Sequence, residues 1–269
     1  MLNLFLSQTK ERKGTFMRKF KINAQLELII TQDDEEMSLE AAKIVANLIE
    51  HKPNATLGLA SGRSPIGMYK NLIAWHQMGE ISFKEVSTYN LDEYFPLSPS
   101  NPCSYHHFMQ EHFFSHIDIL PENTHLPNGS TENSDLECAF YEDLIRKIGG
   151  VDLQVLGIGT NGHIGFNEPE AYFEPFTHKV RLNWQTLLDN ASFFGTSDEI
   201  PTEAITMGIG TIMSAKHILL LASGSKKAPI LKQVLKGKVT PLVPASILQF
   251  HPKVTFVIDE SAASELFPL

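Results

Sequence analysis

The sequence has only two cysteines in 269 residues, and it has no long apolar run. Cys103 and Cys138 cannot form a disulfide framework, and without a Cys/His cluster they do not indicate structural zinc. A reducing cytoplasm is therefore the expected location. The longest apolar stretches, such as Ile218–Ala222, are far shorter than the roughly 20 residues that a membrane helix needs. We therefore expect no membrane partner.

A block of basic residues is also missing. The chain has 22 Lys and Arg against 31 Asp and Glu, so its net charge is −9. This balance argues against nucleic acid as a partner. It leaves room for a small phosphorylated ligand bound by a few local cations. Repeats and Gly/Ser-rich linkers are absent too, so nothing divides the chain into separate domains.

The amino end does not read as a targeting signal. The apolar Met1–Leu6 precedes the basic Lys10–Lys13, whereas a signal peptide has its positive charges first. Met17 stands immediately before the first strand-like stretch. We expect residues 1–16 to be an N-terminal extension outside the fold, and residues 17–269 to form one domain.

Strand-like and helical patterns alternate along the rest of the chain. We predict strands at 26–31, 55–60, 86–91, 151–157, 217–223 and 254–259, and helices at 38–51, 65–78, 102–114, 136–148 and 226–235. This order predicts an α/β fold, a single-domain, Rossmann-like three-layer sandwich with a mostly parallel central sheet. Ligands bind such sheets beyond the carboxyl ends of the strands. Three of the predicted strand ends carry unusual polar residues.

The first of these is the loop Ser61-Gly62-Arg63-Ser64, between a strand and a helix that starts near Pro65. Backbone N–H groups at a helix start, together with the helix dipole, favour a phosphate. The loop is no Walker A motif, because the Lys-Ser/Thr pair is missing. The alternative is an ordinary turn in which Ser61 or Ser64 caps the helix. Arg63 favours the anion site.

The second strand end carries the adjacent acids Asp92 and Glu93. Neighbouring side chains point in different directions, so at most one of them faces a pocket. A carboxylate held there could act as a general base. A solvated turn is the alternative.

The third strand end opens the glycine-rich segment Gly157–Pro169, which contains Asn161, His163 and Glu168. A histidine steered by a carboxylate can shuttle a proton near neutral pH. A lone histidine is more often structural, but this density of polar residues among glycines favours function. The glycine spacing does not fit a dinucleotide fingerprint.

Two other patterns are weak. His106, His107, His112 and His116 alternate with phenylalanines on a predicted helix, which is typical of an amphipathic face rather than a metal site. No Gly-x-Ser-x-Gly elbow supports a serine hydrolase.

Taken together, the loops resemble the glucosamine-6-phosphate deaminase (isomerase) family, which shares a superfamily with 6-phosphogluconolactonases and sugar-sensing regulator domains. The resemblance runs from about Met17 to Asp259. It rests on the segments LGLASGRSPIGMYKNL, NLDEY, SYHHFMQEHFF, LGIGTNGHIGFNEP, ITMGIGTIM and VPASILQFHP.

The resemblance implies an enzyme that isomerises and deaminates an amino-sugar phosphate, first of all glucosamine 6-phosphate, to fructose 6-phosphate and ammonia. Asp92 would move the proton from carbon 2 to carbon 1. His163 would open the ring, with Glu168 and Asn161 orienting it. Neither a metal nor an organic cofactor is implied.

The resemblance also implies that the substrate phosphate sits on the backbone of Ser61, Gly62, Arg63 and Ser64, with Lys227 as counter-charge. Galactosamine 6-phosphate as the substrate, or a non-catalytic sugar-phosphate sensor, are the alternatives. Members with one or several subunits are known in the family, so a homo-oligomer remains open.

Two positions depart from the family pattern. Asn161 stands where some members have Asp, so it can orient a group but cannot accept a proton. Ser192 stands where the family usually has an Arg that reaches the phosphate, whereas Arg63 replaces a residue that is normally small. We hypothesise that Arg63 supplies the missing guanidinium.

Overall fold

The computed structural model describes residues 17–184, 186–188, 194 and 201–267. Its main sheet has eight strands. Their order is β1 (Arg18–Lys21), β2 (Leu26–Thr31), β11 (Val254–Asp259), β10 (Ile218–Ala222), β7 (Leu153–Leu156), β3 (Thr56–Leu59), β4 (Ser87–Asn90) and β6 (Thr124–His125). All neighbours run parallel except β1 and β2, which are antiparallel. The predicted mostly parallel α/β sheet is confirmed.

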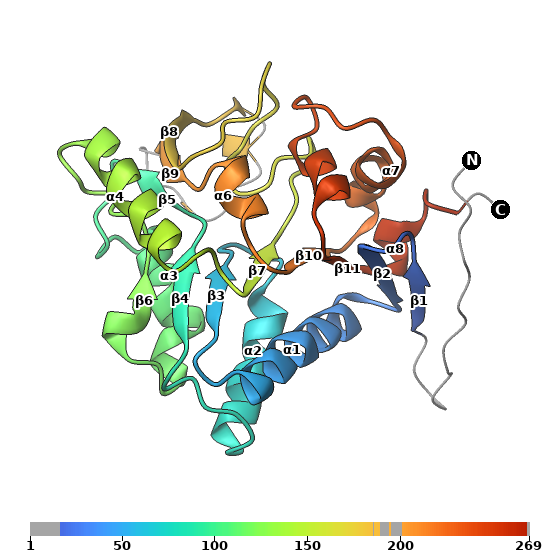
Figure 1. Ribbon diagram of the computed structural model, residues 1–269, viewed down its shortest axis with the longest axis horizontal. Helices are drawn as coiled ribbons and strands as arrows, with labels where there is room; N and C mark the ends of the chain where they lie inside the picture. The colour runs from blue at the N-terminus through green and yellow to red at the C-terminus, as the bar shows by residue number, and fades with distance from the viewer. Residues whose placement is uncertain (1–16, 185, 189–193, 195–200, 268–269) are drawn as a thin grey trace.

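Helices cover the sheet on both sides. In Figure 1, α1 (Asp34–His51) and α2 (Ile66–Gln77) lie on one side of the strands, and α6 (Ile209–Met213) and α7 (Ala228–Lys236) lie on the other. The structure also describes the helices α3 (Tyr105–His112), α4 (Ser134–Lys147) and α8 (Glu260–Ala263). Among the described residues, none of the helices has the length and apolar character needed to cross a bilayer.

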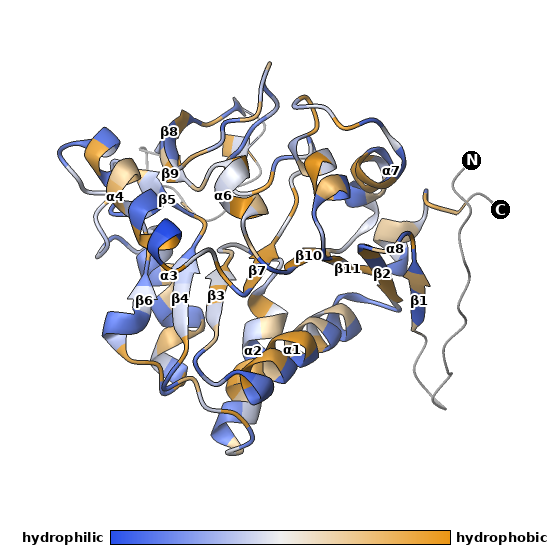
Figure 2. Cartoon of the chain, in the orientation of Figure 1, coloured by the Kyte–Doolittle hydropathy of each residue, from blue (hydrophilic) through white to orange (hydrophobic). Residues whose placement is uncertain are grey.

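The core follows the central strands. Every residue of β10 and β11 is buried, and Figure 2 shows that these strands are hydrophobic. Strands of this kind are typical of a parallel sheet that is covered on both faces, because neither side meets water.

A second, antiparallel sheet was not predicted. It consists of β5 (Asp92–Phe95), β9 (Glu203–Thr206) and β8 (His178–Arg181), in that order. It has its own small apolar cluster, made by Tyr94, Phe166, Leu182, Phe194 and Ala204. Asp92 is the first residue of β5, so the strand end predicted to hold it leads directly into another sheet.

The predicted start of the first helix at residue 38 is wrong, because α1 begins at Asp34. The Asp33 side chain caps it by accepting a hydrogen bond from the Glu36 N–H at 2.9 Å. Three acids in the first turn also suit the positive end of the helix dipole. Ser38 lies buried inside the helix instead of capping it.

The parallel strands bring their carboxyl ends to one edge of the sheet. Leu59, Asn90, Leu156, Ala222 and Asp259 end their strands there, and the loops that follow lie beside one another. The predicted extension, residues 1–16, lies outside the described residues and stays a prediction.

Candidate active site

A cavity of about 1070 Å³ opens at this edge of the sheet. Loops that follow β3, β7 and β10 line it, together with the first residue of β5. Seven of the predicted site residues line the cavity: Ser61, Gly62, Arg63, Ser64, Asp92, His163 and Lys227. Asn161 and Glu168 do not line it, and they lie behind His163 instead.

The loop after β3 presents backbone groups to the cavity. Within the described part of the chain, the N–H groups of Gly62 and Ser64 donate no hydrogen bond. The capping position of α2 is taken by Pro65, and no side chain caps the helix, so the alternative in which Ser61 or Ser64 caps it is wrong. A helix start without a side-chain cap leaves N–H donors for an anion.

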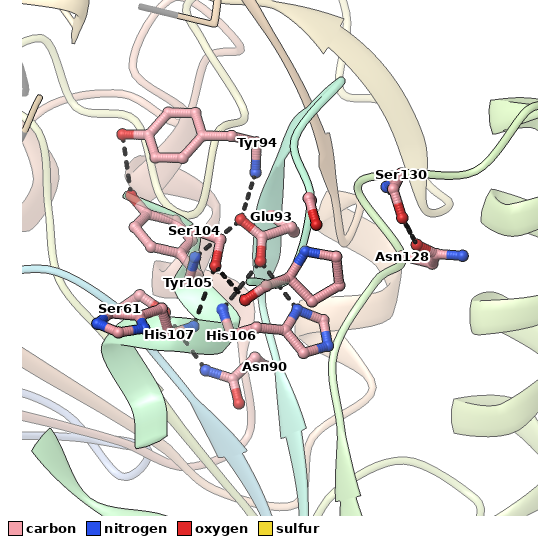
Figure 3. A network of polar contacts seen from close by, with 12 residues as sticks. Ser61, Asn90, Glu93, Tyr94, Ser104, Tyr105, His106, His107, Asn128 and Ser130 are labelled. Atoms are coloured by element: carbon pink, nitrogen blue, oxygen red, sulfur yellow. Dashed lines mark hydrogen bonds and ion pairs between the residues drawn. The ribbon is translucent and has the colours of Figure 1, made fainter. Parts of the chain in front are cut away.

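Ser61 is held from the neighbouring strand. The amide of Asn90, the last residue of β4, donates a hydrogen bond to Ser61 Oγ at 3.3 Å (Figure 3). Asn90 is completely buried and does not line the cavity. Its contact therefore orients the serine from behind.

Asp92 is the only one of the two adjacent acids that lines the cavity. Its side chain is buried. Burial, and after it the negative charge of Glu93, raises the pKa of Asp92 to about 8. A carboxylate with this pKa is a far stronger base than an ordinary aspartate when it is ionised.

Glu93 points away from the cavity and has a structural role. It is completely buried and accepts hydrogen bonds from the N–H groups of Tyr105 and His106, at 2.8 and 2.9 Å (Figure 3). The His106 ring contacts the same carboxylate through Nδ1 at 3.0 Å. Glu93 thus holds the start of α3, and the expected divergence of the two acids is confirmed.

His163 stands beside a buried carboxylate. Its Nδ1 lies 3.7 Å from Glu168 Oε2, close enough for electrostatic attraction but too long for a hydrogen bond. Asn161 connects the two residues: its amide donates to Glu168 Oε2 at 2.7 Å, and its carbonyl oxygen accepts from the His163 N–H at 3.1 Å.

Glu168 is kept ionised by its neighbours. Burial tends to raise its pKa, but the contacts with His163, Thr186 and Asn161 outweigh burial and hold the pKa below its ordinary value. Thr186 Oγ1 donates a hydrogen bond to Glu168 Oε1.

The histidine ring fits only because Gly159 has no side chain. A Cβ at Gly159 would lie 2.3 Å from His163 Nδ1 and Cε1, closer than any real contact. The glycine-rich segment therefore brings the backbone against the ring, which explains one glycine of the motif.

Lys227 approaches from the loop after β10. Its ammonium donates a hydrogen bond to the carbonyl oxygen of Ile158 at 2.7 Å, which ties this loop to the loop that carries His163. Ser223, Gly224, Ser225 and Lys226 line the cavity as well.

The prediction missed these four residues, although a strand followed by a Gly/Ser loop and lysines was a usable signal. It also missed Tyr105 and Thr186, which line the cavity from elements distant in sequence. Ser192, where the family usually has an Arg, lies outside the described residues.

The fold and this cavity define a doubly wound α/β protein that brings together a helix start without a side-chain cap, a buried carboxylate and a histidine–glutamate pair. More specifically, the chain belongs to the family described as glucosamine-6-phosphate isomerases/6-phosphogluconolactonases, whose profile matches residues 32–256. The match covers the three strand ends that form the site.

Individual relatives are similar over most of their length. The chain is 54% identical to a glucosamine-6-phosphate deaminase from Thermoanaerobacter pseudethanolicus, over 89% of this chain and 94% of the relative. It is 51% identical to one from Clostridium novyi, over 90% of this chain and all of the relative.

Solved structures agree. A structure described as a monomeric glucosamine-6-phosphate deaminase superposes with a TM-score of 0.86 at 47% identity, covering 90% of this chain and 99% of that one. A 6-phosphogluconolactonase from Trypanosoma cruzi, at 17% identity, superposes with a TM-score of 0.72 over 90% of this chain and 97% of its own, which is a likeness of fold alone.

Proposed function

We propose that this protein is an enzyme that converts glucosamine 6-phosphate and water to fructose 6-phosphate and ammonia. One observation carries the proposal: a helix start without a side-chain cap, a buried carboxylate of high pKa and a histidine line the same cavity. The names of the similar proteins point to the same activity.

The substrate phosphate is held by the loop after β3. The N–H groups of Gly62 and Ser64 and the start of α2 offer donors, and Arg63 and Lys227 line the same cavity with positive charge. Charge-assisted hydrogen bonds of this kind are the strong ones in proteins. They fix the sugar so that its reacting carbons lie deeper in the cavity, toward Asp92.

Ring opening falls to His163. Because Nδ1 faces Glu168, the other ring nitrogen, Nε2, exchanges the proton with the ring oxygen or the anomeric hydroxyl of the sugar. Glu168 stabilises the charge that the imidazole gains, and Asn161 holds His163 and Glu168 in place through its hydrogen bonds to both residues. All of these groups come from one loop.

The isomerisation falls to Asp92. As a carboxylate it removes the proton from carbon 2 of the open-chain sugar, which gives an enolamine, and returns that proton to carbon 1. The product is a ketose imine. Water then adds at carbon 2, and ammonia leaves, so that fructose 6-phosphate remains. These steps use protein groups and water.

The test measures ammonia and ketose released from glucosamine 6-phosphate and from galactosamine 6-phosphate, and acid released by hydrolysis of 6-phosphogluconolactone. We expect both products from glucosamine 6-phosphate in equal amounts. Turnover of the galacto epimer alone would move the assignment to that sugar, because epimers differ in only a few pocket contacts. No turnover, but thermal stabilisation by one of these ligands, would support a sensor and contradict the enzyme.

We also propose that the enzyme works in the reducing cytoplasm. Both cysteines are thiols in the structure, Cys138 being buried. Burial, with smaller contributions from Asp135 and Glu137, raises the pKa of the Cys138 thiol to about 11, so little reactive thiolate forms. If the proposal holds, non-reducing mass spectrometry finds no disulfide, and the activity is equal with and without a reductant such as dithiothreitol.

A further inference from the structure

Asp259 is a buried acid outside the cavity that the proposed chemistry does not use. It is the last residue of β11, it is 7% exposed, and it is not among the residues that line the cavity. Such a carboxylate needs hydrogen-bond donors to offset its lost hydration. The identity of those donors shows what it does.

Both oxygens of Asp259 accept the same backbone group of the loop after β10. The Gly224 N–H lies 3.0 Å from Oδ1 and 3.0 Å from Oδ2. Gly224 itself lines the cavity and has a φ of 86°, a conformation that favours glycine. The carboxylate thus holds the loop at this left-handed residue.

The contact continues to Lys227. The Gly224 carbonyl oxygen accepts a hydrogen bond from the Lys227 N–H at 3.0 Å, and the Lys227 ammonium reaches the Ile158 carbonyl at 2.7 Å. The contact of Asp259 with the Gly224 N–H and that of the Gly224 carbonyl with the Lys227 N–H therefore connect Asp259 to Lys227, whose ammonium is held in turn by Ile158. The strands agree with this arrangement, because β10 and β11 are paired in parallel up to Ala222 and Ile258, one residue before Asp259.

We propose that Asp259 is a positioning residue for substrate binding: it holds the loop after β10 so that Lys227 meets the phosphate of the substrate. The inference rests on the proposed function for the identity of the substrate. Its other contact is structural, since Asp259 Oδ1 also accepts from the Ala262 N–H at 2.7 Å and caps α8.

The variant Asp259→Ser separates the two roles. Serine is a good helix cap, so the contact with Ala262 is kept, but its single oxygen cannot also hold the Gly224 N–H. We expect the KM for glucosamine 6-phosphate to rise about tenfold while kcat stays within about twofold, because binding changes and chemistry does not. Asn133→Ser is the control: it replaces the capping side chain of α4, none of whose described residues lines the cavity, and KM should not move.

A double-mutant cycle shows whether Asp259 acts through Lys227. In a Lys227→Ala background, Asp259→Ser should raise KM no further, since residues of one network are not additive. An equal rise in both backgrounds would overturn the inference, and so would a folded Asp259→Ser protein with unchanged KM. If the serine variant does not fold, Asp259→Asn replaces it. That amide has one acceptor oxygen where the carboxylate has two, so we expect its KM to rise above that of the wild type, but by less than the rise expected for Asp259→Ser.

Inorganic phosphate keeps the test independent of turnover. Its affinity, measured by calorimetry, should fall in Asp259→Ser and not in Asn133→Ser. Suppose that the wild type turns over no amino-sugar phosphate but binds inorganic phosphate more tightly than Asp259→Ser does. The proposed function would then be contradicted, and the positioning role would stand. If the wild type turns over glucosamine 6-phosphate, but wild type and Asp259→Ser have equal phosphate affinities and equal KM values, the proposed function stands and the positioning role is contradicted.

Discussion

At the scale of single residues, the environment of Asp92 distinguishes it from an ordinary surface acid. It shares a strand with Glu93, and burial and that second charge raise its pKa to about 8. The sequence predicted that one of the two acids faces a pocket. It could not predict the raised pKa, because the burial comes from α3 and the second sheet, which are packed from other parts of the chain.

The pH dependence of kcat/KM follows from this pKa. Asp92 acts as a base only when ionised, so kcat/KM should rise with pH through a midpoint near 8. The ionisations of the substrate are titrated separately by NMR and divided out of the profile. A midpoint near the value of an exposed aspartate, about 3.9, would contradict the buried base.

The same pKa predicts a stability effect for Asp92→Asn. The folded-state pKa of Asp92, about 8, lies above its unfolded-state pKa. Between these two pKa values the native state therefore binds more protons than the unfolded state does. The contribution of Asp92 to stability therefore falls as pH rises toward 8. The Asn variant lacks this loss, so its melting temperature should exceed that of the wild type by several degrees at pH 9. The melting temperatures of the variant and the wild type should converge at pH 4. A constant difference would show that Asp92 does not titrate as stated.

Arg63 tests whether this chain holds the phosphate from a new position. It lines the cavity beside the start of α2. Arg63→Ala should raise the KM for glucosamine 6-phosphate by roughly ten- to a hundredfold, since a hydrogen bond to a charged group contributes about 1.5–3 kcal/mol. Arg146→Ala, which removes an exposed arginine from the end of α4, is the control. An unchanged KM in Arg63→Ala would show that its guanidinium does not bind the phosphate.

At the scale of elements, the glycine-rich loop after β7 was the clearest signal in the sequence. Its order of Asn161, His163 and Glu168 predicted a proton relay, and the three residues do lie together. The sequence could not predict that Thr186 completes the surroundings of Glu168, because it comes from a segment 18 residues away with no recognisable motif.

Gly159→Ala tests the close contact within this loop. The new Cβ would lie 2.3 Å from the His163 ring, so the ring must move away from Glu168. We expect kcat to fall by about a hundredfold, the size of a lost acid–base contribution, with a smaller change in KM. The control is Gly149→Ala, where a Cβ would have no neighbour within 4 Å but the φ of +72° strains an alanine, so this variant should lose melting temperature without losing kcat. A kcat in Gly159→Ala equal to that control would mean that the ring position is not critical.

At the scale of the whole molecule, alternating strands and helices were enough to predict a parallel α/β fold and the edge that carries the site. The second sheet was missed because β5 begins with two acids, β8 is mostly basic and β9 begins with Glu203, so none of them has the apolar run that marks the equally short β7. The strand order was beyond reach as well, since it depends on which strands pair. A net charge of −9 is compatible with the proposed phosphate site, because Arg63 and Lys227 both line the cavity.

The central claim is that Asp92 moves a proton on an amino-sugar phosphate. Its most direct test compares ammonia release from glucosamine 6-phosphate by the wild type and by Asp92→Asn, with folding checked by circular dichroism. The account predicts steady release of ammonia and fructose 6-phosphate by the wild type, and a loss of at least about a thousandfold in the folded variant. Release by the variant at close to the wild-type rate would contradict it.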